Sequence, residues 1–149
     1  MGEIEESLIA IPRINPNNFN TYASQFLESY DVKNTALAFK INDANSTGLK
    51  GFLHVPFDCE ITGYSLLADV AGNVVVDIWV DVFANFPPTI ADTITAAAKP
   101  TLAAAQGVLS TVLTGWTVAL TAGDVIAFNI DSTLTLTELL VTLFVEKTL

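Results

Sequence analysis

The chain has 149 residues, of which 51% are hydrophobic and 15% are charged, and its formal net charge at pH 7 is −10. This length suits one domain whose core is large enough to fold without disulfides or bound metal. The acidic balance argues against functions that neutralise phosphates or anionic lipids, so neither nucleic acid nor a membrane is expected as a partner. The shortage of charge favours subunit interfaces, where charged residues are depleted.

The beginning of the chain lacks the pattern of a secretory signal. Glu3, Glu5 and Glu6 make it acidic where a signal peptide is basic. No apolar run approaches the roughly 18 residues of a membrane-spanning helix. Synthesis in the cytoplasm is therefore expected. Cys59 is the only cysteine, so it cannot form an internal disulfide, and its apolar surroundings predict a buried free thiol.

The pattern of the chain changes near Gly51. Residues 1–50 contain turn-forming stretches, including Asn15–Asn18 and Asn42–Gly48, and show little periodicity. From Gly51 onward, short β-branched runs alternate with turns. We predict an irregular N-terminal arm or anchoring segment over residues 1–50 and an all-β domain over residues 51–149. The expected fold is an antiparallel, jelly-roll-like β-sandwich that forms without the arm.

The clearest predicted strand covers residues 74–83. Its period of two places Val76, Ile78, Val80 and Val82 on one face, and a mixture of carboxylates and aromatic rings on the other. A turn at residues 71–73 predicts a hairpin between this strand and the run at residues 60–69. The mixed face is expected to be half-solvated or to lie at an interface.

The C-terminal part predicts two further strands, over residues 125–130 and 136–147. In the last strand Leu139, Val141, Leu143 and Val145 share one face, and the opposite face is also largely apolar, which is typical of a central strand. Between the halves, residues 91–107 contain two alanine runs interrupted by Pro100. Because proline breaks helices, this segment is predicted to be a long connection with at most one helical turn.

No residue pattern predicts a catalytic site, a metal site or a cofactor. His54 is the only histidine and follows an apolar run, so we interpret it as structural. The glycines form no phosphate-binding motif. Asp77 and Asp81 share a strand face, which we interpret as solvated or hydrogen-bonded. The alternatives are a calcium site, a sugar-binding carboxylate or, ranked last, the acid pair of a glycan depolymerase.

Several aromatic residues offer a candidate contact surface. Aromatic faces can stack on the apolar faces of sugar rings, although packing in the core or at an interface is the commoner role. The candidate residues for an interface or a glycan contact are Tyr64, Asp77, Trp79, Asp81, Phe83, Phe86 and Trp116.

Residues 55–148 resemble a β-sandwich module found in tail-fibre and other virion proteins of tailed bacteriophages. The segments that carry the resemblance are Val55–Tyr64, Asp77–Asp81, Asn85–Ile94, Ala98–Leu102, Leu113–Trp116, Ala122–Val125 and Phe128–Ser132. The resemblance implies a non-enzymatic structural protein of the virion, commonly trimeric, made in the host cytoplasm.

The chain is short for a long fibre, so the expected role is a capsid decoration (cement) protein or a head fibre. Its expected partners are further copies of itself, as a homotrimer, and another virion protein such as the major capsid protein. The residues after Ala68-Asp69 differ from the module. The alternative role is a receptor-binding tail fibre or tip that recognises a host surface glycan.

Overall fold

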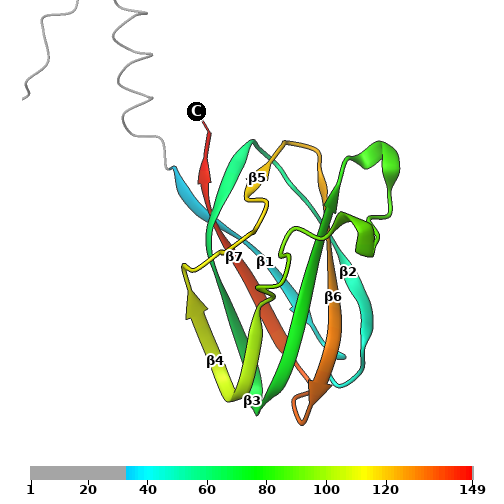
Figure 1. The fold of residues 1–149 in the computed structure, drawn as a ribbon, viewed down its shortest axis with the longest axis vertical. Helices are drawn as coiled ribbons and strands as arrows, with labels where there is room; N and C mark the ends of the chain where they lie inside the picture. The colour runs from blue at the N-terminus through cyan, green and yellow to red at the C-terminus, as the bar shows by residue number, and fades with distance from the viewer. Residues whose placement is uncertain (1–32, 149) are drawn as a thin grey trace, which may run out of the picture. The chain divides into compact units, whose positions relative to one another are not determined.

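The computed structural model describes residues 33–148, which form an all-β antiparallel fold (Figure 1). This confirms the predicted fold class at that level. The strands are β1 (Asn34–Ile41), β2 (Gly48–His54), β3 (Cys59–Asp81), β4 (Thr101–Ser110), β5 (Ala119–Leu120), β6 (Val125–Leu134) and β7 (Leu139–Lys147). Two short 3-10 turns, η1 (Phe83–Asn85) and η2 (Ile90–Asp92), follow β3. Within residues 33–148 there is no helix long and apolar enough to cross a membrane.

The strands form one strongly curled sheet in the order β1-β7-β3-β6-β2, and β4 and β5 pair with β3. The first part of β3, residues 59–68, pairs with β7, whereas residues 73–81 pair with β6. Figure 1 shows β3 running to one end of the fold and then turning back. The sheet therefore has a first wing, β1, β7 and residues 59–68, and a second wing, β2, β6 and residues 73–81.

The bend in β3 falls where the sequence predicts a turn, but the hairpin prediction is wrong. The two halves of β3 pair with different strands and not with each other. A Cβ atom on Gly72 would lie 2.5 Å from the carbonyl oxygen of Leu134, so the chain passes too close for any side chain. Close approach of two backbones, and not a two-stranded turn, thus explains the glycine at this bend.

The core lies between the two wings. Leu139, Val141, Leu143 and Val145 of β7 are all buried, as their alternation predicts. The strand lies between β1 and β3, which confirms its predicted central position. Phe39 of β1 stacks on Phe128 of β6, with 4.9 Å between the ring centroids, and joins the wings across the core.

The predicted boundary at residues 50 and 51 falls inside β2, and residues 34–41 form β1. Leu37 and Ile41 of β1 are buried in the core, so this part of the expected arm belongs to the sheet. The turn-forming residues 42–47 connect β1 to β2. These turn-forming residues obscured the two strands that flank them in the sequence. Residues 1–32 of the expected arm lie outside the described residues.

The expected long connection is a second correction. Residues 101–110 form β4, which pairs with both halves of β3 and follows the same bend (Figure 1). Thr101 lies opposite Val75 at one end of the strand, and Ser110 lies opposite Tyr64 at the other. Alanine and glycine have low strand propensity, so pairing with a long neighbouring strand overrides the local preference.

Candidate interaction site

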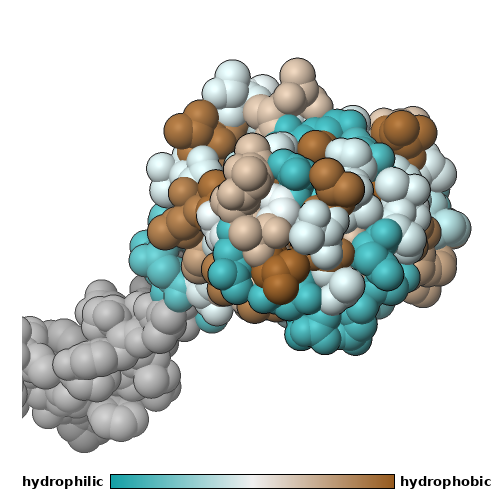
Figure 2. Space-filling view, turned by 90° about the horizontal axis from the view of Figure 1, so that it is seen from below, coloured by the Kyte–Doolittle hydropathy of each residue, from teal (hydrophilic) through white to brown (hydrophobic). Residues whose placement is uncertain are grey.

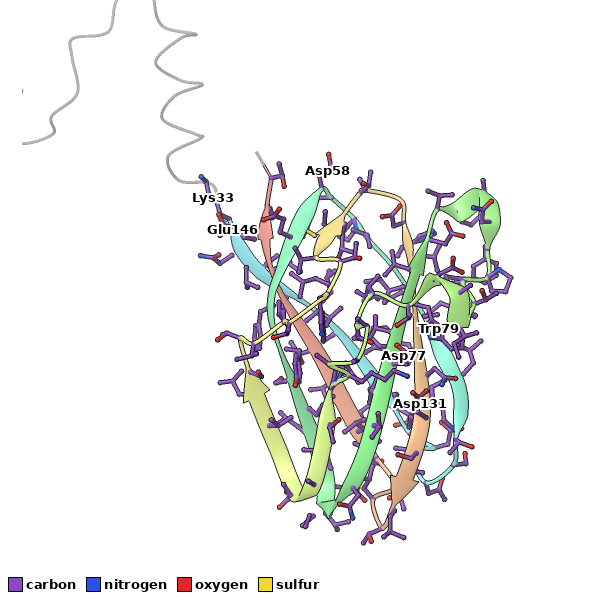
Figure 3. The ribbon with its side chains drawn as sticks, in the orientation of Figure 1. Lys33, Asp58, Asp77, Trp79, Asp131 and Glu146 are labelled. Carbon is purple, nitrogen blue, oxygen red and sulfur yellow. The ribbon has the colours of Figure 1, made fainter. Side chains whose placement is uncertain are left out.

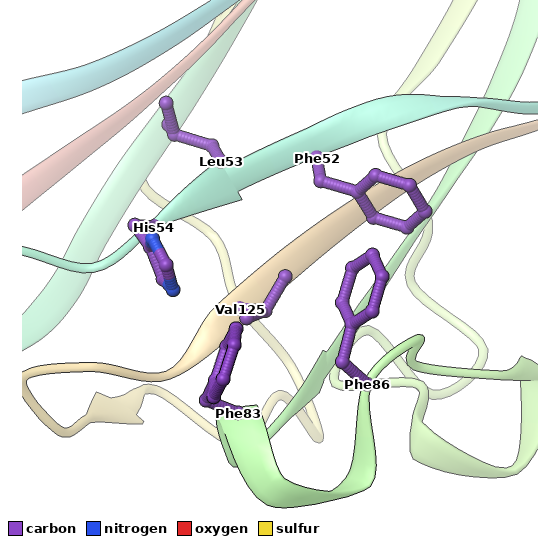
Figure 4. Close-up of a pocket in the computed structure, with 6 residues that line it drawn as sticks. All are labelled: Phe52, Leu53, His54, Phe83, Phe86 and Val125. Atoms are coloured by element: carbon purple, nitrogen blue, oxygen red, sulfur yellow. The ribbon is translucent and has the colours of Figure 1, made fainter.

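An aromatic cleft of about 260 Å³ lies where β2 ends beside the loop that follows β3 (Figure 4). We define the aromatic cleft by its lining residues, Phe52, Leu53, His54, Phe83, Phe86 and Val125. Val125 begins β6 and forms part of the buried core. The cleft therefore combines an edge strand, a loop and the start of an interior strand.

The rings of the cleft pack on one another yet stay accessible. Phe52 meets Phe86 edge to face with 4.7 Å between centroids, and His54 lies 5.6 Å from Phe83. The exposed fractions of Phe83 and Phe86 are 63% and 48%. Solvent-exposed aromatic groups that gather in a hollow mark a binding surface more often than isolated exposed residues do.

The loop that carries Phe83 and Phe86 is held by its own polar groups. Asp81 accepts hydrogen bonds from the backbone N–H of Val82 (2.7 Å) and the side-chain amide of Asn85 (3.2 Å). Thr89 and Asp92 form a capping box around η2, in which the Asp92 carboxylate accepts from the Thr89 backbone N–H at 2.7 Å. The aspartates of this loop thus have structural partners.

Asp77 is the most enclosed carboxylate among the described residues and anchors the chain that follows this loop. It is fully buried and accepts hydrogen bonds from Thr93 Oγ1 (2.6 Å) and Thr95 Oγ1 (2.8 Å). Trp79 Nε1 donates to the same carboxylate at 2.9 Å, as does the backbone N–H of Ile78. Such saturation is what a buried carboxylate requires.

Lys99 balances the charge of this carboxylate. Its Nζ lies 3.4 Å from Asp77 Oδ2 and 2.5 Å from Asp131 Oδ2, and Figure 3 labels both aspartates. Burial raises the pKa of Asp77, but the hydrogen bonds from Thr93, Trp79 and Thr95 and the charge of Lys99 outweigh it and hold that pKa below its ordinary value. Asp77 is therefore a charged structural anchor.

Four of the seven predicted contact residues fall into two pairs. Phe83 and Phe86 meet in the aromatic cleft. Tyr64 and Trp116 are buried and stack with 5.5 Å between centroids, and Trp116 Nε1 donates to the carbonyl of Ala98 at 2.8 Å. Their rings belong to the core and present no open face to a ligand.

The aspartate pair does not form an open acidic pocket. Asp77 is enclosed, whereas Asp81 is half-buried and caps the loop described above. Trp79 is half-buried, with its indole N–H committed to Asp77. In residues 33–148, no group of three or more histidine, cysteine, aspartate or glutamate side chains is arranged to hold a metal ion.

Phe52 and His54 were not among the predicted contact residues, although both line the aromatic cleft. The alternation in β2 carries a signal for them, because Phe52 and His54 are exposed while Leu53 between them is half-buried. Their meeting with Phe83 could not be predicted from spacing, since it depends on how the sheet curls.

The apolar surface at the end where β3 and β4 bend is more dispersed than the aromatic cleft (Figure 2). Figure 2 views the end at which β3 and β4 bend and shows hydrophobic residues in separate areas among hydrophilic ones.

No family model and no curated protein sequence matches the chain.

Proposed function

We propose that the chain is a non-enzymatic structural protein of a tailed-phage virion, either a capsid decoration (cement) protein or a head fibre. The observation that carries this proposal is the aromatic cleft, whose exposed rings have no cover within the described chain. A partner surface that inserts an apolar side chain would bury these rings. The resemblance of residues 55–148 to virion modules supplies the particle as the setting.

The fold supports the same proposal. We infer that the curled sheet is the jelly-roll-like sandwich expected from the sequence, with two wings that share β3 and β4. The loop that carries η1 and η2 and the turn between β2 and β3 lie toward the end opposite the bend (Figure 1), where they can contact a particle without disturbing the core. A rigid body with a loop-built contact surface suits a repeated shell component.

The proposed partners are the major capsid protein or another virion protein, together with two further copies of this chain in a homotrimer. The net charge of −10 gives no support to nucleic acid or a membrane as a partner. Two acidic residues lie close in sequence to residues of the aromatic cleft: Asp81, which ends β3, is two positions before Phe83, and Asp124 directly precedes Val125. A particle surface on which basic residues surround a protruding apolar side chain would complement the aromatic cleft and its acidic neighbours.

The test is addition of the purified full-length chain to phage particles assembled without it. Co-sedimentation measures binding, and cryo-electron microscopy locates the added density. We expect density over the capsid lattice. The double variant Phe83→Ala/Phe86→Ala should bind at least about tenfold more weakly, because these exposed side chains would form the contact.

A matched control is Leu134→Ala, which removes an equally exposed apolar side chain near the bend. It should bind particles as the unmodified chain does. Absence of the unmodified chain from every particle would contradict the proposed function. Full binding by the Phe83→Ala/Phe86→Ala variant would show that the aromatic cleft is not the surface that contacts the particle.

A second candidate function is glycan recognition at a tail tip. The specific observation in its favour is the pair of accessible phenylalanine rings beside His54, since sugar rings stack on aromatic faces and an imidazole can hydrogen-bond their hydroxyl groups. Binding of the purified chain to host cells or to an immobilised surface glycan, lost in the Phe83→Ala/Phe86→Ala variant, would support it. Density at the tail tip alone would favour it over decoration.

A further inference from the structure

The edge strand β4 and the loop after it carry no charge. Between Lys99 and Asp124 the sequence contains no aspartate, glutamate, lysine, arginine or histidine. In the described chain β4 pairs only with β3, so its other edge has no strand beside it. An open edge without charge invites another chain, because proteins usually protect such edges with charged residues, lysine above all.

The other two long edge strands are protected in that way. β1 contains Lys40, which pairs with Glu138 at 3.4 Å. β2 contains Lys50, whose side chain is only 4% exposed and pairs with Asp43 at 3.1 Å, and an inward-pointing charge also disfavours edge pairing. Among the three long edge strands of this sheet, β4 alone contains no charged residue.

Exposed aliphatic side chains accompany the uncharged edge. We define the β4 edge surface by β4 together with Leu67, Leu109 and Val112. Leu109 and Val112 are 72% and 68% exposed. Leu67 of β3 lies opposite Gly107 of β4, and Leu109 is two residues farther along β4. Leu67 and Leu109 are therefore diagonal neighbours on one face of the sheet.

Charge decides which partner suits this surface. Each copy has a net charge of −10, so two copies repel wherever their acidic surfaces meet, and least where charge is absent. A basic partner would gain more from the acidic loops than from an uncharged strand. The β4 edge surface thus fits a second copy of this chain better than a basic partner.

We infer that the β4 edge surface is the contact between copies of this chain. The inference rests on the proposed assembly function and names one surface through which neighbouring copies contact each other. Backbone groups at the open edge of β4 would pair with the neighbouring copy, and Leu109 and Val112 would be buried between them. The aromatic cleft, formed by β2, β6 and the loop after β3, stays free for the particle.

The test compares the mass of the full-length chain in solution with that of three variants, by light scattering after size exclusion over a range of concentrations. Leu109→Asp and Val112→Asp place a charge on the β4 edge surface. Ile90→Asp is the control, because Ile90 is 67% exposed but lies on η2. We expect an oligomer for the unmodified chain and Ile90→Asp, and about a hundredfold weaker association for the two edge variants.

Hydrogen exchange on the unmodified chain adds a measurement that needs no variant. Amides of residues 101–110 should exchange more slowly as concentration and oligomer fraction rise. An unmodified chain that remains monomeric at its highest soluble concentration would overturn the inference. So would an oligomer that both edge variants retain, or one that leaves exchange in residues 101–110 unchanged.

Failure of this inference and failure of the proposed function are distinguishable, because self-association is measured without particles. A monomeric chain that still binds particles would overturn the inference and leave the function in place. An oligomer that depends on Leu109 and Val112 but binds no particle would support the inference and overturn the function.

Discussion

The hydroxyl group of Thr95 donates a 2.8 Å hydrogen bond to the carboxylate of Asp77, and both residues are fully buried. They are 18 positions apart in the sequence. The bond holds the chain after η2 against the second half of β3. Thr93 Oγ1 donates a second hydrogen bond to the same carboxylate, at 2.6 Å. Loss of this anchor would loosen the loop that carries Phe83 and Phe86.

Replacing Asp77 is predicted to destabilise the fold strongly. Asp77→Ala leaves the donors of Thr93, Thr95 and Trp79 without an acceptor, at a cost of about 2–4 kcal/mol in the free energy of unfolding. Urea unfolding monitored by tryptophan fluorescence measures this loss. Thr95→Val, which removes one donor and keeps the shape, should cost about 1 kcal/mol. Equal stability of Asp77→Ala and the unmodified chain would disprove the anchoring role.

Stability is predicted to fall in acid because of the same carboxylate. The pKa of Asp77 is lower in the folded chain than its ordinary value of about 4, so the charge of Asp77 favours folding above that pH. The stabilisation is lost as pH falls through the lowered folded pKa. The pKa of Asp69 is also lowered, chiefly by the hydrogen bond from Thr137. Protonation of Asp69 in acid therefore also lowers the stability of the fold. Unfolding curves at a series of pH values below about 5 measure the effect.

The comparison for that experiment is Asp77→Asn, which cannot titrate at this position. Its free energy of unfolding should depend less steeply on pH in the acid range than that of the unmodified chain. Identical slopes would show that Asp77 has the same pKa folded and unfolded.

Gly72→Ala is predicted to destabilise the bend in β3. Its new Cβ would lie 2.5 Å from a backbone carbonyl oxygen, so the two backbones must separate, at a cost of about 1–3 kcal/mol. Gly107→Ala is a matched control, because its Cβ would lie 3.3 Å from the end of the flexible Leu67 side chain and at an ordinary contact distance of 3.5 Å from the Leu66 carbonyl oxygen. Thermal unfolding should show a lower midpoint for Gly72→Ala and little change for Gly107→Ala.

Deletion of residues 1–50 is predicted to prevent folding of the remaining chain. It removes all of β1, including buried Leu37 and Ile41, and it removes Phe39, whose ring stacks on Phe128 across the core. Circular dichroism and proteolysis would report the unfolded chain. The point variant Phe39→Ala should retain the fold with about 2–3 kcal/mol lower stability. A folded, protease-resistant fragment 51–149 would contradict the role of β1.

The thiol of Cys59 is predicted to react slowly in the folded chain. Burial raises its pKa, and the nearby charges of Asp58 and Asp124 act in the same direction, so little thiolate forms near pH 8. A thiol reagent should modify the native chain much more slowly than the urea-unfolded chain. Equal rates would show that Cys59 is accessible.

The strands with regular alternation could be predicted from the sequence, and those defined by pairing could not. β7 and the second half of β3 show their buried faces through a period of two. β1 has the same period at Leu37, Phe39 and Ile41, but the nearby turn residues concealed it. β4 has small residues and no clear period, so only its neighbour β3 makes it a strand.

The candidate site was predicted in part for a similar reason. Phe83 was predicted as the last residue of a strand and begins η1 instead, and Phe86 follows it, so the place of these exposed rings along the chain could be anticipated closely. Thr93 and Thr95, which donate to Asp77, lie on a later loop, and Phe52 comes from another strand. Contacts between segments far apart in the chain depend on the curl of the sheet, which periodicity does not encode.

The bend that places β3 in both wings has a consequence for how the domain folds. Neither wing can form its hydrogen bonds without a strand that also belongs to the other, so the two wings should melt together in one cooperative transition. β6 and β7 must also find partners far back in the chain, which makes the entropy of closing loops a large part of the folding barrier. The sheet is therefore expected to fold slowly and, once formed, to resist partial opening.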